Sequence, residues 1–345
     1  MLLRILKRRV KTCLSDMLVA AGPCPWLLRC RPLILMYHRI LPEAEAARSH
    51  TSPYIITHEQ TFALQMRYLA DHCLPVPLSD LVSALAQNKR LAPLTVAVTF
   101  DDGWEDNSTV ALPILKRYSI PATVFLTTSF IGSTRVFWQE RLRFLLMQLA
   151  ANESRLAPAL PGFLSGQPDA VKALPLAQQQ DARVVAGVEE LPGVVRESFL
   201  DTLQSFLGRP AFDQARHAFL SWEQAAEMHC AGVELGSHTV SHHNLTRLSD
   251  QELANELTES KALLREKLNI DATALAYPTG YYDARVMAAA RTAGYSVAVT
   301  TEKRALDRKD APLALPRLNI CESRFLAPSG RFSPNMFAAA LAGFF

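Results

Sequence analysis

The chain has 345 residues and a formal net charge of +3, and 49% of its residues are hydrophobic. Its length allows one large α/β domain or two smaller ones, and its composition is that of a globular protein. This charge gives no reason to expect nucleic acid as a partner. The six cysteines are scattered and form no Cys-x-x-Cys pair. They therefore argue against a disulfide framework or a zinc ribbon and favour a reducing compartment.

The first 31 residues form a distinct basic segment. They contain seven Lys or Arg against a single acid, Asp16, and their apolar stretch is broken by Gly22, Pro23 and Pro25. This apolar stretch is too short for a membrane-spanning helix, and it is too interrupted for the apolar core of a secretory signal. We expect residues 1–31 to be an amphipathic helix on an anionic membrane surface. A helix packed on the domain and a poorly formed signal peptide are the alternatives. The expected location is therefore cytoplasmic, peripheral on the inner membrane surface, with export as the alternative.

Residues 32–345 alternate apolar strands with helices, in chain order. The predicted strands cover residues 33–38, 95–100, 123–127, 233–236, 274–277, 296–300 and 315–320. The predicted helices begin at Thr57 and cover 78–87, 111–118, 250–268 and 283–293, and an apolar helix follows Pro334. Capping-box spacing occurs at Thr57–Gln60, Ser221–Gln224 and Ser249–Glu252. Repeated strand–helix units predict a mostly parallel sheet flanked by helices, in a barrel-like α/β fold.

Residues 132–220 interrupt this alternation. They are rich in Pro, Ala and Gln, with helical patterns over 136–149 and 194–207. We expect a helical insertion that covers the mouth of the domain or forms a partner surface.

Two adjacent carboxylates follow the buried strand at residues 95–100. Asp101 and Asp102 lie where α/β enzymes place catalytic groups, at the carboxyl end of a parallel strand. Two like charges side by side are costly unless a cation compensates them, and a divalent metal would do so. An exposed Asp-Asp-Gly turn explains the pair equally well when it is considered alone.

A histidine pair follows another predicted strand. His238 and His242 are four residues apart, and on a helical turn that spacing places both rings on one face. Two imidazoles and one carboxylate would make a three-ligand site with an open position for water, suited to zinc or a similar divalent ion. Because the histidines, like Asp102, follow a predicted strand, we favour a metal site over a histidine pair without a ligand role.

Three ordered motifs carry a family resemblance. They are Thr99–Gly103 (TFDDG), Ser237–His242 (SHTVSH) and Ala276–Gly280 (AYPTG). The chain resembles the polysaccharide deacetylase family, the NodB-like carbohydrate esterases, over about residues 33–131 and 220–320. The Tyr37–Arg39 and Ala293–Tyr295 segments look like the branch that includes the poly-N-acetylglucosamine deacetylases.

The resemblance implies a distorted (β/α) barrel that hydrolyses an N-acetyl group on a sugar with a divalent metal, for which zinc is expected. It assigns Asp101 as the general base and Asp102, His238 and His242 as the metal ligands. The expected substrate is a cell-surface polysaccharide or a lipid-linked glycan precursor.

The sequence departs from the family at two positions. Many members have an Arg before the proline motif that orients the base, where this chain has Ala276; we expect Arg317 to replace it. Many members also have a late His that protonates the leaving amine, but no His follows His243. We expect His38 to be this acid, while a purely packing role for His38 remains open.

Three aromatic residues are candidates for substrate binding. Trp104, Tyr277 and Tyr281 could each stack on a sugar ring, although core packing is an equal alternative. Two other functions also remain open. One is hydrolysis of another C–N bond, such as a formyl or cyclic amide, and the other is a degenerate glycan-binding protein without catalysis.

Overall fold

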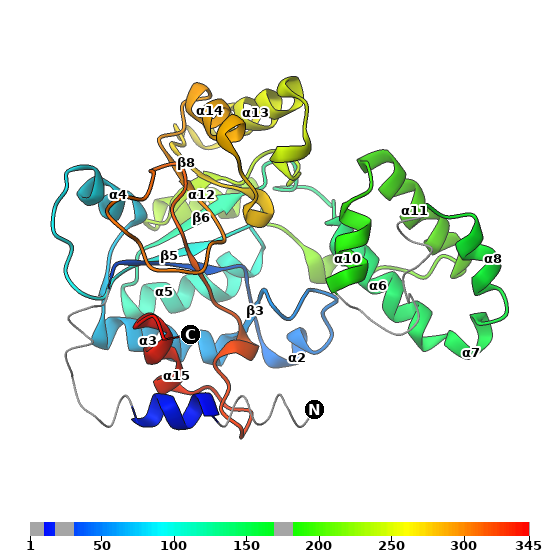
Figure 1. Cartoon of the computed structure of the whole chain (residues 1–345), viewed down its shortest axis with the longest axis horizontal. Coiled ribbons are helices and arrows are strands. Elements are labelled where there is room, and N and C mark those ends of the chain that lie inside the picture. Colours follow the sequence, from blue (N-terminus) through cyan, green and yellow to red (C-terminus); the bar gives the residue numbers. More distant parts are fainter. Residues whose placement is uncertain (1–9, 18–30, 169–181, 345) are drawn as a thin grey trace. The chain divides into compact units, whose positions relative to one another are not determined.

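The structure is a computed structural model that describes residues 10–17, 31–168 and 182–344 (Figure 1). The chain divides into two compact units. The barrel unit comprises Met1–Ala47, Pro53–Ser133 and Phe219–Phe345, and the helical unit comprises Arg48–Ser52 and Thr134–Ala218. The predicted insertion at about 132–220 thus falls largely in the helical unit, which also takes in a short loop from much earlier in the chain.

The barrel unit is built on a parallel sheet in the order β10-β1-β5-β6-β7-β8-β9, with β4 also paired to β5. The strands are β1 Leu33–Tyr37, β4 Leu74–Pro75, β5 Thr95–Phe100, β6 Ala122–Leu126, β7 Glu234–Ser237, β8 Ala274–Ala276, β9 Val297–Val299 and β10 Leu318–Asn319. Leu315 also bridges Val299, so the segment around β10 contacts both β9 and β1. The sheet therefore curls into the predicted distorted (β/α) barrel.

The central strands are buried on both sides because helices cover the sheet. Every residue of β1, β5 and β6 is buried, which explains their continuous apolar sequences. Strand β5 pairs with β1 in register from Leu33–Val96 to Tyr37–Phe100. Residues directly after these two strands, His38 and Asp101, are therefore brought to the same edge of the sheet.

Helices surround the sheet and follow the predicted pattern. They are α2 Glu43–Ala46, α3 Glu59–His72, α4 Leu78–Ala86, α5 Leu112–Tyr118, α12 Trp222–Cys230, α13 Asp250–Leu268, α14 Ala284–Thr292 and α15 Pro334–Leu341. A π-helix, η2 Asn107–Ala111, precedes α5, and short 3-10 turns lie at η4 Leu245–Arg247, η5 Pro278–Gly280 and η6 Glu322–Arg324. A separate parallel pair joins β2 Arg39–Leu41 to β3 Ile56–His58.

Two of the three predicted capping boxes are confirmed, at the starts of α12 and α13. The one predicted from Thr57 is wrong. Helix α3 begins at Glu59, and its N-cap residue His58 makes no side-chain cap. Instead, Glu322 accepts hydrogen bonds from the His58 N–H at 3.0 Å and the Thr61 hydroxyl at 2.8 Å. Glu322, which is far away in sequence, thus accepts hydrogen bonds from polar groups at the start of α3.

The helical unit has its own hydrophobic core. Its helices are α6 Trp138–Ala151, α7 Glu153–Leu156, α8 Leu160–Ser165, α10 Ala182–Glu189 and α11 Gly193–Phe206, with the 3-10 turn η3 Gln214–His217. Polar contacts attach the loop Arg48–Ser52 to the helices of this unit. The Thr51 hydroxyl donates to Glu140 at 2.7 Å, and the His217 ring lies 2.9 Å from the same carboxylate.

Of the predicted N-terminal segment, the structure describes residues 10–17, which are helical, and Arg31. This helix contacts α15 through Thr12 and Met336 and through Asp16 and Asn335. Its apolar Val10, Leu14 and Met17 remain exposed. Among the described residues, no helix has the length and apolar character needed to cross a membrane.

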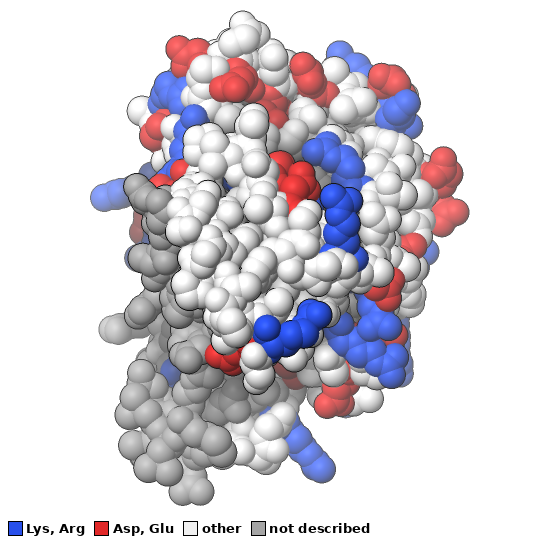
Figure 2. Space-filling view, turned by 90° about the vertical axis from the view of Figure 1, so that its right-hand side faces the viewer, with Lys and Arg blue, Asp and Glu red and all other residues white. Residues whose placement is uncertain are grey.

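The molecular surface carries charges of both signs. The face drawn in Figure 2 shows Lys and Arg interspersed with Asp and Glu around a broad uncharged area. Among the exposed apolar side chains, Val194 at the start of α11 is 85% accessible.

The close packing of β7 before the histidine pair can be tested at Gly236. A Cβ at this position would lie 2.6 Å from the Phe125 ring and 3.0 Å from the Ala274 carbonyl oxygen. We expect Gly236→Ala to lower the free energy of unfolding by about 1–3 kcal/mol, as overpacking does. Urea denaturation measures this, with Gly162→Ala as the control because a Cβ there meets nothing within 4 Å. Equal effects of the two substitutions would contradict the expected constraint.

Candidate active site and metal centre

Asp101 and Asp102 follow β5 and are both buried, at 2% and 4% exposure. The chain turns sharply between them and the next element, since Asp102 and Gly103 have φ angles of 77° and 81°. A side chain at Gly103 would also collide with Leu126 and Ile131. This turn points the two adjacent carboxylates toward different partners, so the exposed-turn alternative is wrong.

Arg317 pairs with Asp101 through two hydrogen bonds. Its Nη1 and Nη2 donate to the two carboxylate oxygens at 2.7 and 2.6 Å, and its Nε donates to the Thr300 carbonyl at 2.9 Å. Burial raises the pKa of Asp101, but Arg317, together with the nearby His238 and His38, holds that pKa below its ordinary value. Asp101 is therefore an ionised carboxylate in a fixed orientation, and Arg317 occupies the position expected for it.

The histidine pair lies on an irregular loop after β7. The predicted helical turn is wrong, because no helix covers residues 238–244. Thr239 and His242 instead have φ angles of 67° and 58°, and this backbone brings the His238 and His242 rings to 4.8 Å between centroids. The pairing therefore depends on a strained loop rather than on helical periodicity.

Glu256 of α13 holds this loop in place. One of its oxygens accepts the N–H groups of Val240 at 2.8 Å and Ser241 at 2.9 Å, and the other lies 3.6 Å from the His243 ring. Reasoning from the sequence missed Glu256, since nothing local marks a helical glutamate as the hydrogen-bond partner of the loop that precedes its helix.

Asp102, His238 and His242 form a candidate metal centre. The Oδ1 of Asp102 lies 3.4 Å from the Nε2 atoms of both rings, and all three ligand atoms are within 4.8 Å of one another. Ligands about 2.0–2.1 Å from a tetrahedral zinc ion stand about 3.3 Å apart, which matches the two separations between Asp102 and the histidines. Among the described residues, Asp102 Oδ1 is buried with no hydrogen-bond partner, as expected of a metal ligand.

The protonation pattern also suits a metal. His238 Nδ1 lies 2.8 Å from the Ala276 carbonyl, an acceptor that requires hydrogen on Nδ1 and leaves a lone pair on Nε2 of the neutral ring. Burial, together with the neighbouring His238, lowers the pKa of His242 to about 4, so that this ring is neutral at ordinary pH. Burial opposes ionisation of Asp102, but its histidine contacts hold its pKa well below the ordinary value.

Two of the three predicted sugar-binding aromatics are buried. Trp104 has 0% exposure and donates its indole N–H to Asp102 Oδ2 at 2.8 Å. Tyr277 also has 0% exposure and donates its hydroxyl to the Leu313 carbonyl at 2.9 Å. Their predicted sugar contacts are therefore wrong, since neither ring offers a free face. Tyr281 is 57% exposed and remains a candidate.

His38 lies beside the base. Its Nε2 is 4.0 Å from an Asp101 oxygen, and its side chain is 13% exposed. Burial lowers the pKa of His38, against the opposing influence of Asp102 and Asp101. The structure thus places a neutral imidazole with partial solvent access next to the candidate base.

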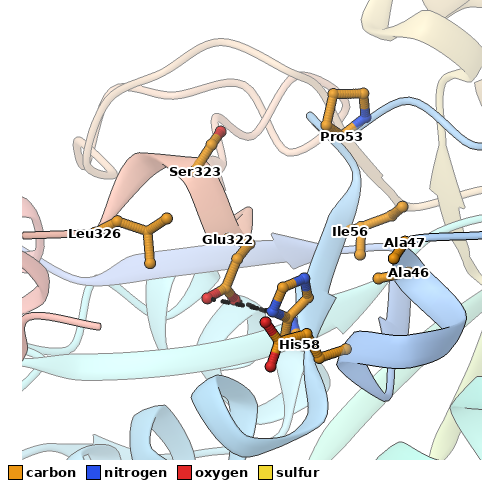
Figure 3. A pocket seen from close by; sticks show the side chains of 9 residues that line it. Ala46, Ala47, Pro53, Ile56, His58, Glu322, Ser323 and Leu326 are labelled. Carbon is orange, nitrogen blue, oxygen red and sulfur yellow. Dashed lines mark hydrogen bonds and ion pairs between the residues drawn. The ribbon is translucent and has the colours of Figure 1, made fainter. Parts of the chain in front are cut away.

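A separate pocket of about 300 Å³ lies where β3 meets η6 (Figure 3). His58 and Glu322 lie side by side at its wall, with His58 Nδ1 3.7 Å from a Glu322 oxygen, and the other lining residues are mainly apolar. Such a combination is typical of pockets for small ligands. The pocket is lined by Glu43, Ala46, Ala47, Pro53, Ile56, His58, Glu322, Ser323 and Leu326, and none of these belongs to the metal cluster.

Comparisons with known proteins show similarity in sequence and in fold. The polysaccharide deacetylase family matches residues 88–175 and 176–298. The chain is 24% identical over 288 residues to YxkH of Bacillus subtilis (strain 168), provisionally assigned as a polysaccharide deacetylase; the match covers 83% of this chain and 70% of YxkH.

Two solved structures have the same fold. The Streptococcus pyogenes deacetylase PplD, in complex with acetate, is 22% identical with a TM-score of 0.55, and the match covers 87% of this chain and 96% of PplD. IcaB from Ammonifex degensii is 19% identical with a TM-score of 0.55, covering 91% of this chain and 96% of IcaB. Since the family match spans more than half of the sequence, the chain belongs to the polysaccharide deacetylase family.

Proposed function

We propose that this protein removes the N-acetyl group from an amino-sugar unit of a glycan by metal-dependent hydrolysis. Its family acts on N-acetyl groups, and it is therefore a hydrolase of carbon–nitrogen bonds. The observation that carries the proposal is the convergence of Asp102, His238 and His242 beside the ion-paired Asp101. The buried, complete set argues against the alternative of a degenerate glycan-binding protein.

Zinc suits this donor set best, because imidazole nitrogen and a carboxylate oxygen are common zinc ligands. When bound, such an ion would polarise the acetyl carbonyl and lower the pKa of a bound water. The residues that would hold it are Asp102, through Oδ1, and the two histidines, through Nε2.

Asp101 is the proposed general base. Its oxygens each accept one hydrogen bond from Arg317, so each retains acceptor capacity for a water molecule. The carboxylate takes the proton of the water as the water oxygen attacks the acetyl carbon. Since Arg317 keeps the pKa of Asp101 low, the pair holds the base ionised and oriented, whereas it limits how strongly Asp101 retains the proton.

Collapse of the tetrahedral carbon breaks the C–N bond, and the departing nitrogen needs a proton. His38 is the proposed donor, because it is the imidazole next to Asp101 outside the metal cluster. Because the ring is neutral, it first accepts the proton that Asp101 has taken from water, and then, as imidazolium, it donates a proton to the departing nitrogen.

The proposed substrate is a cell-surface polysaccharide or a lipid-linked precursor, and Tyr281 is the proposed aromatic contact to the sugar. We further propose a cytoplasmic location with peripheral membrane contact through residues 1–31, with export as the alternative. In the described part of that segment, Val10, Leu14 and Met17 have helical spacing and are all exposed, which supports contact with a lipid surface. The contacts of the same helix with α15 support its alternative role as a packed helix.

Substitutions of Asp101 and Asp102 should have different effects on metal binding and on catalysis. We expect Asp102→Ala to lose both bound metal and acetate release, because it removes a ligand. Asp101→Asn should retain the metal but lower kcat by at least about 10²-fold, as loss of a general base does. Metal analysis and acetate release from N-acetylated glycans measure these effects. Thermal unfolding is the control, since Asp101→Asn also leaves Arg317 without its anionic partner. A metal-free variant with full activity would contradict the proposal.

The acid can be tested by His38→Gln, which preserves a polar side chain that cannot titrate. We expect kcat to fall by about 10²-fold or more with unchanged metal content. An unchanged rate of acetate release would show that His38 is not the acid.

Membrane contact can be tested by flotation with anionic vesicles. We expect the double variant Leu14→Gln and Met17→Gln to weaken partitioning by about 10-fold or more, since it removes two apolar side chains from the interface. Leu64→Gln is the matched control, because Leu64 is exposed to the same extent, 48%, as Leu14. Equal partitioning of the wild type and the double variant would contradict contact through this helix.

A further inference from the structure

The two oxygens of Asp102 have different surroundings. Oδ1 faces the two imidazoles and has no hydrogen-bond partner among the described residues, while Oδ2 accepts the indole N–H of Trp104 at 2.8 Å. A tryptophan N–H can only donate, so this bond uses one acceptor site of Oδ2 and fixes the carboxylate with Oδ1 toward the imidazoles. The carboxylate is thus prepared to offer one oxygen to a metal and not both.

The Trp104 ring is held from two sides. Phe219 stacks on it with ring centroids 4.4 Å apart and an angle of 19° between planes. The guanidinium carbon of Arg39 lies 4.4 Å from the Trp104 ring centroid, in a cation–π contact. Two groups at such short distances cannot share one face, so the indole is enclosed between them and is fully buried.

Arg39 is fixed in turn by Asp106. Its Nε donates to Asp106 Oδ2 at 2.9 Å, and the other oxygen of Asp106 accepts the N–H of Ile40 at 2.8 Å. Arg39 and Asp106 are 4% and 5% exposed, so solvent screens this ion pair little. The contacts form one continuous series from Asp106 through Arg39 and Trp104 to Asp102.

We propose that Trp104 is a positioning residue that makes Asp102 a one-oxygen metal ligand, and that Arg39 and Phe219 fix its indole for this purpose. This inference rests on the proposed metal centre and assigns the surrounding residues that set its coordination. Loss of the N–H frees Oδ2 to rotate toward the metal, which raises the coordination number and weakens the preference for a tetrahedral ion. Removal of such a supporting partner typically costs about 10–100-fold in metal affinity.

Cobalt(II) is the probe, because its visible absorption is intense in tetrahedral sites and weak at higher coordination numbers. The full chain, stripped of metal, is titrated with Co²⁺ against a competing chelator. We expect Trp104→Phe to weaken Co²⁺ binding by about 10–100-fold and to reduce the absorption of the bound ion. Trp222→Phe is the matched control, expected to bind as the wild type does.

Two further variants separate the hydrogen bond from packing. Replacing Trp104 by 3-benzothienylalanine keeps the ring shape but exchanges the N–H for sulfur, and should weaken binding as Phe does. Arg39→Lys keeps a cation near Asp106 but loses the planar group over the indole, and should produce a smaller loss in the same direction.

If the benzothienyl variant binds Co²⁺ with the affinity and absorption of the wild type, the proposed role of the N–H is wrong. If Arg39→Lys leaves Co²⁺ affinity unchanged, the proposed role of Arg39 is wrong. A wild-type chain that binds no Co²⁺ would instead contradict the proposed metal centre itself. Binding by the wild type with unaltered binding by the Trp104 variants contradicts only the present inference.

Discussion

The burial of two adjacent carboxylates at the end of β5 is the constraint on which the rest of the site depends. Each buried anion would cost several kcal/mol without compensation. The compensating groups come from different directions, because Arg317 reaches Asp101 from the segment before β10, while Trp104 and the β7 loop surround Asp102. Arg317 and the histidine loop are distant in sequence from the two carboxylates, but β10 and β7 each lie two strands from β5 in the sheet. The strand order of the sheet therefore assembles the site.

Several unfavourable backbone conformations lie in the segments that follow β5, β7 and β8. Asp102, Thr239, His242 and Thr279 all have positive φ angles, although none is glycine and two are β-branched. Such positions cost of order 1–3 kcal/mol each and persist only where neighbouring contacts determine them. Hydrogen bonds accepted by Glu256 and by the Thr239 hydroxyl supply these contacts in the histidine loop. The loop is thus rigid before any ligand arrives, as a preorganised centre requires.

The sequence was sufficient for the fold and the chemistry-bearing motifs, because continuous apolar strands, local capping pairs and the ordered motifs are short-range signals. Predictions from the sequence were wrong or incomplete where contacts between distant residues determine the local structure. The start of α3 depends on Glu322 rather than on the local Thr57, and the histidine loop depends on a helical glutamate. The direction of an aromatic side chain is equally hidden: Trp104 follows a left-handed turn that aims it inward at Asp102, and no periodicity reveals this.

The helical unit includes the loop Arg48–Ser52 as well as Thr134–Ala218, so the chain passes between the two units four times. Thr51 and His217 both contact the buried Glu140, which joins the early loop to the later helices. A deletion of residues 134–218 would therefore strip the loop of its polar partners and expose a threonine that is now buried. The helical unit therefore depends on the loop between β2 and β3 as well as on the later helices.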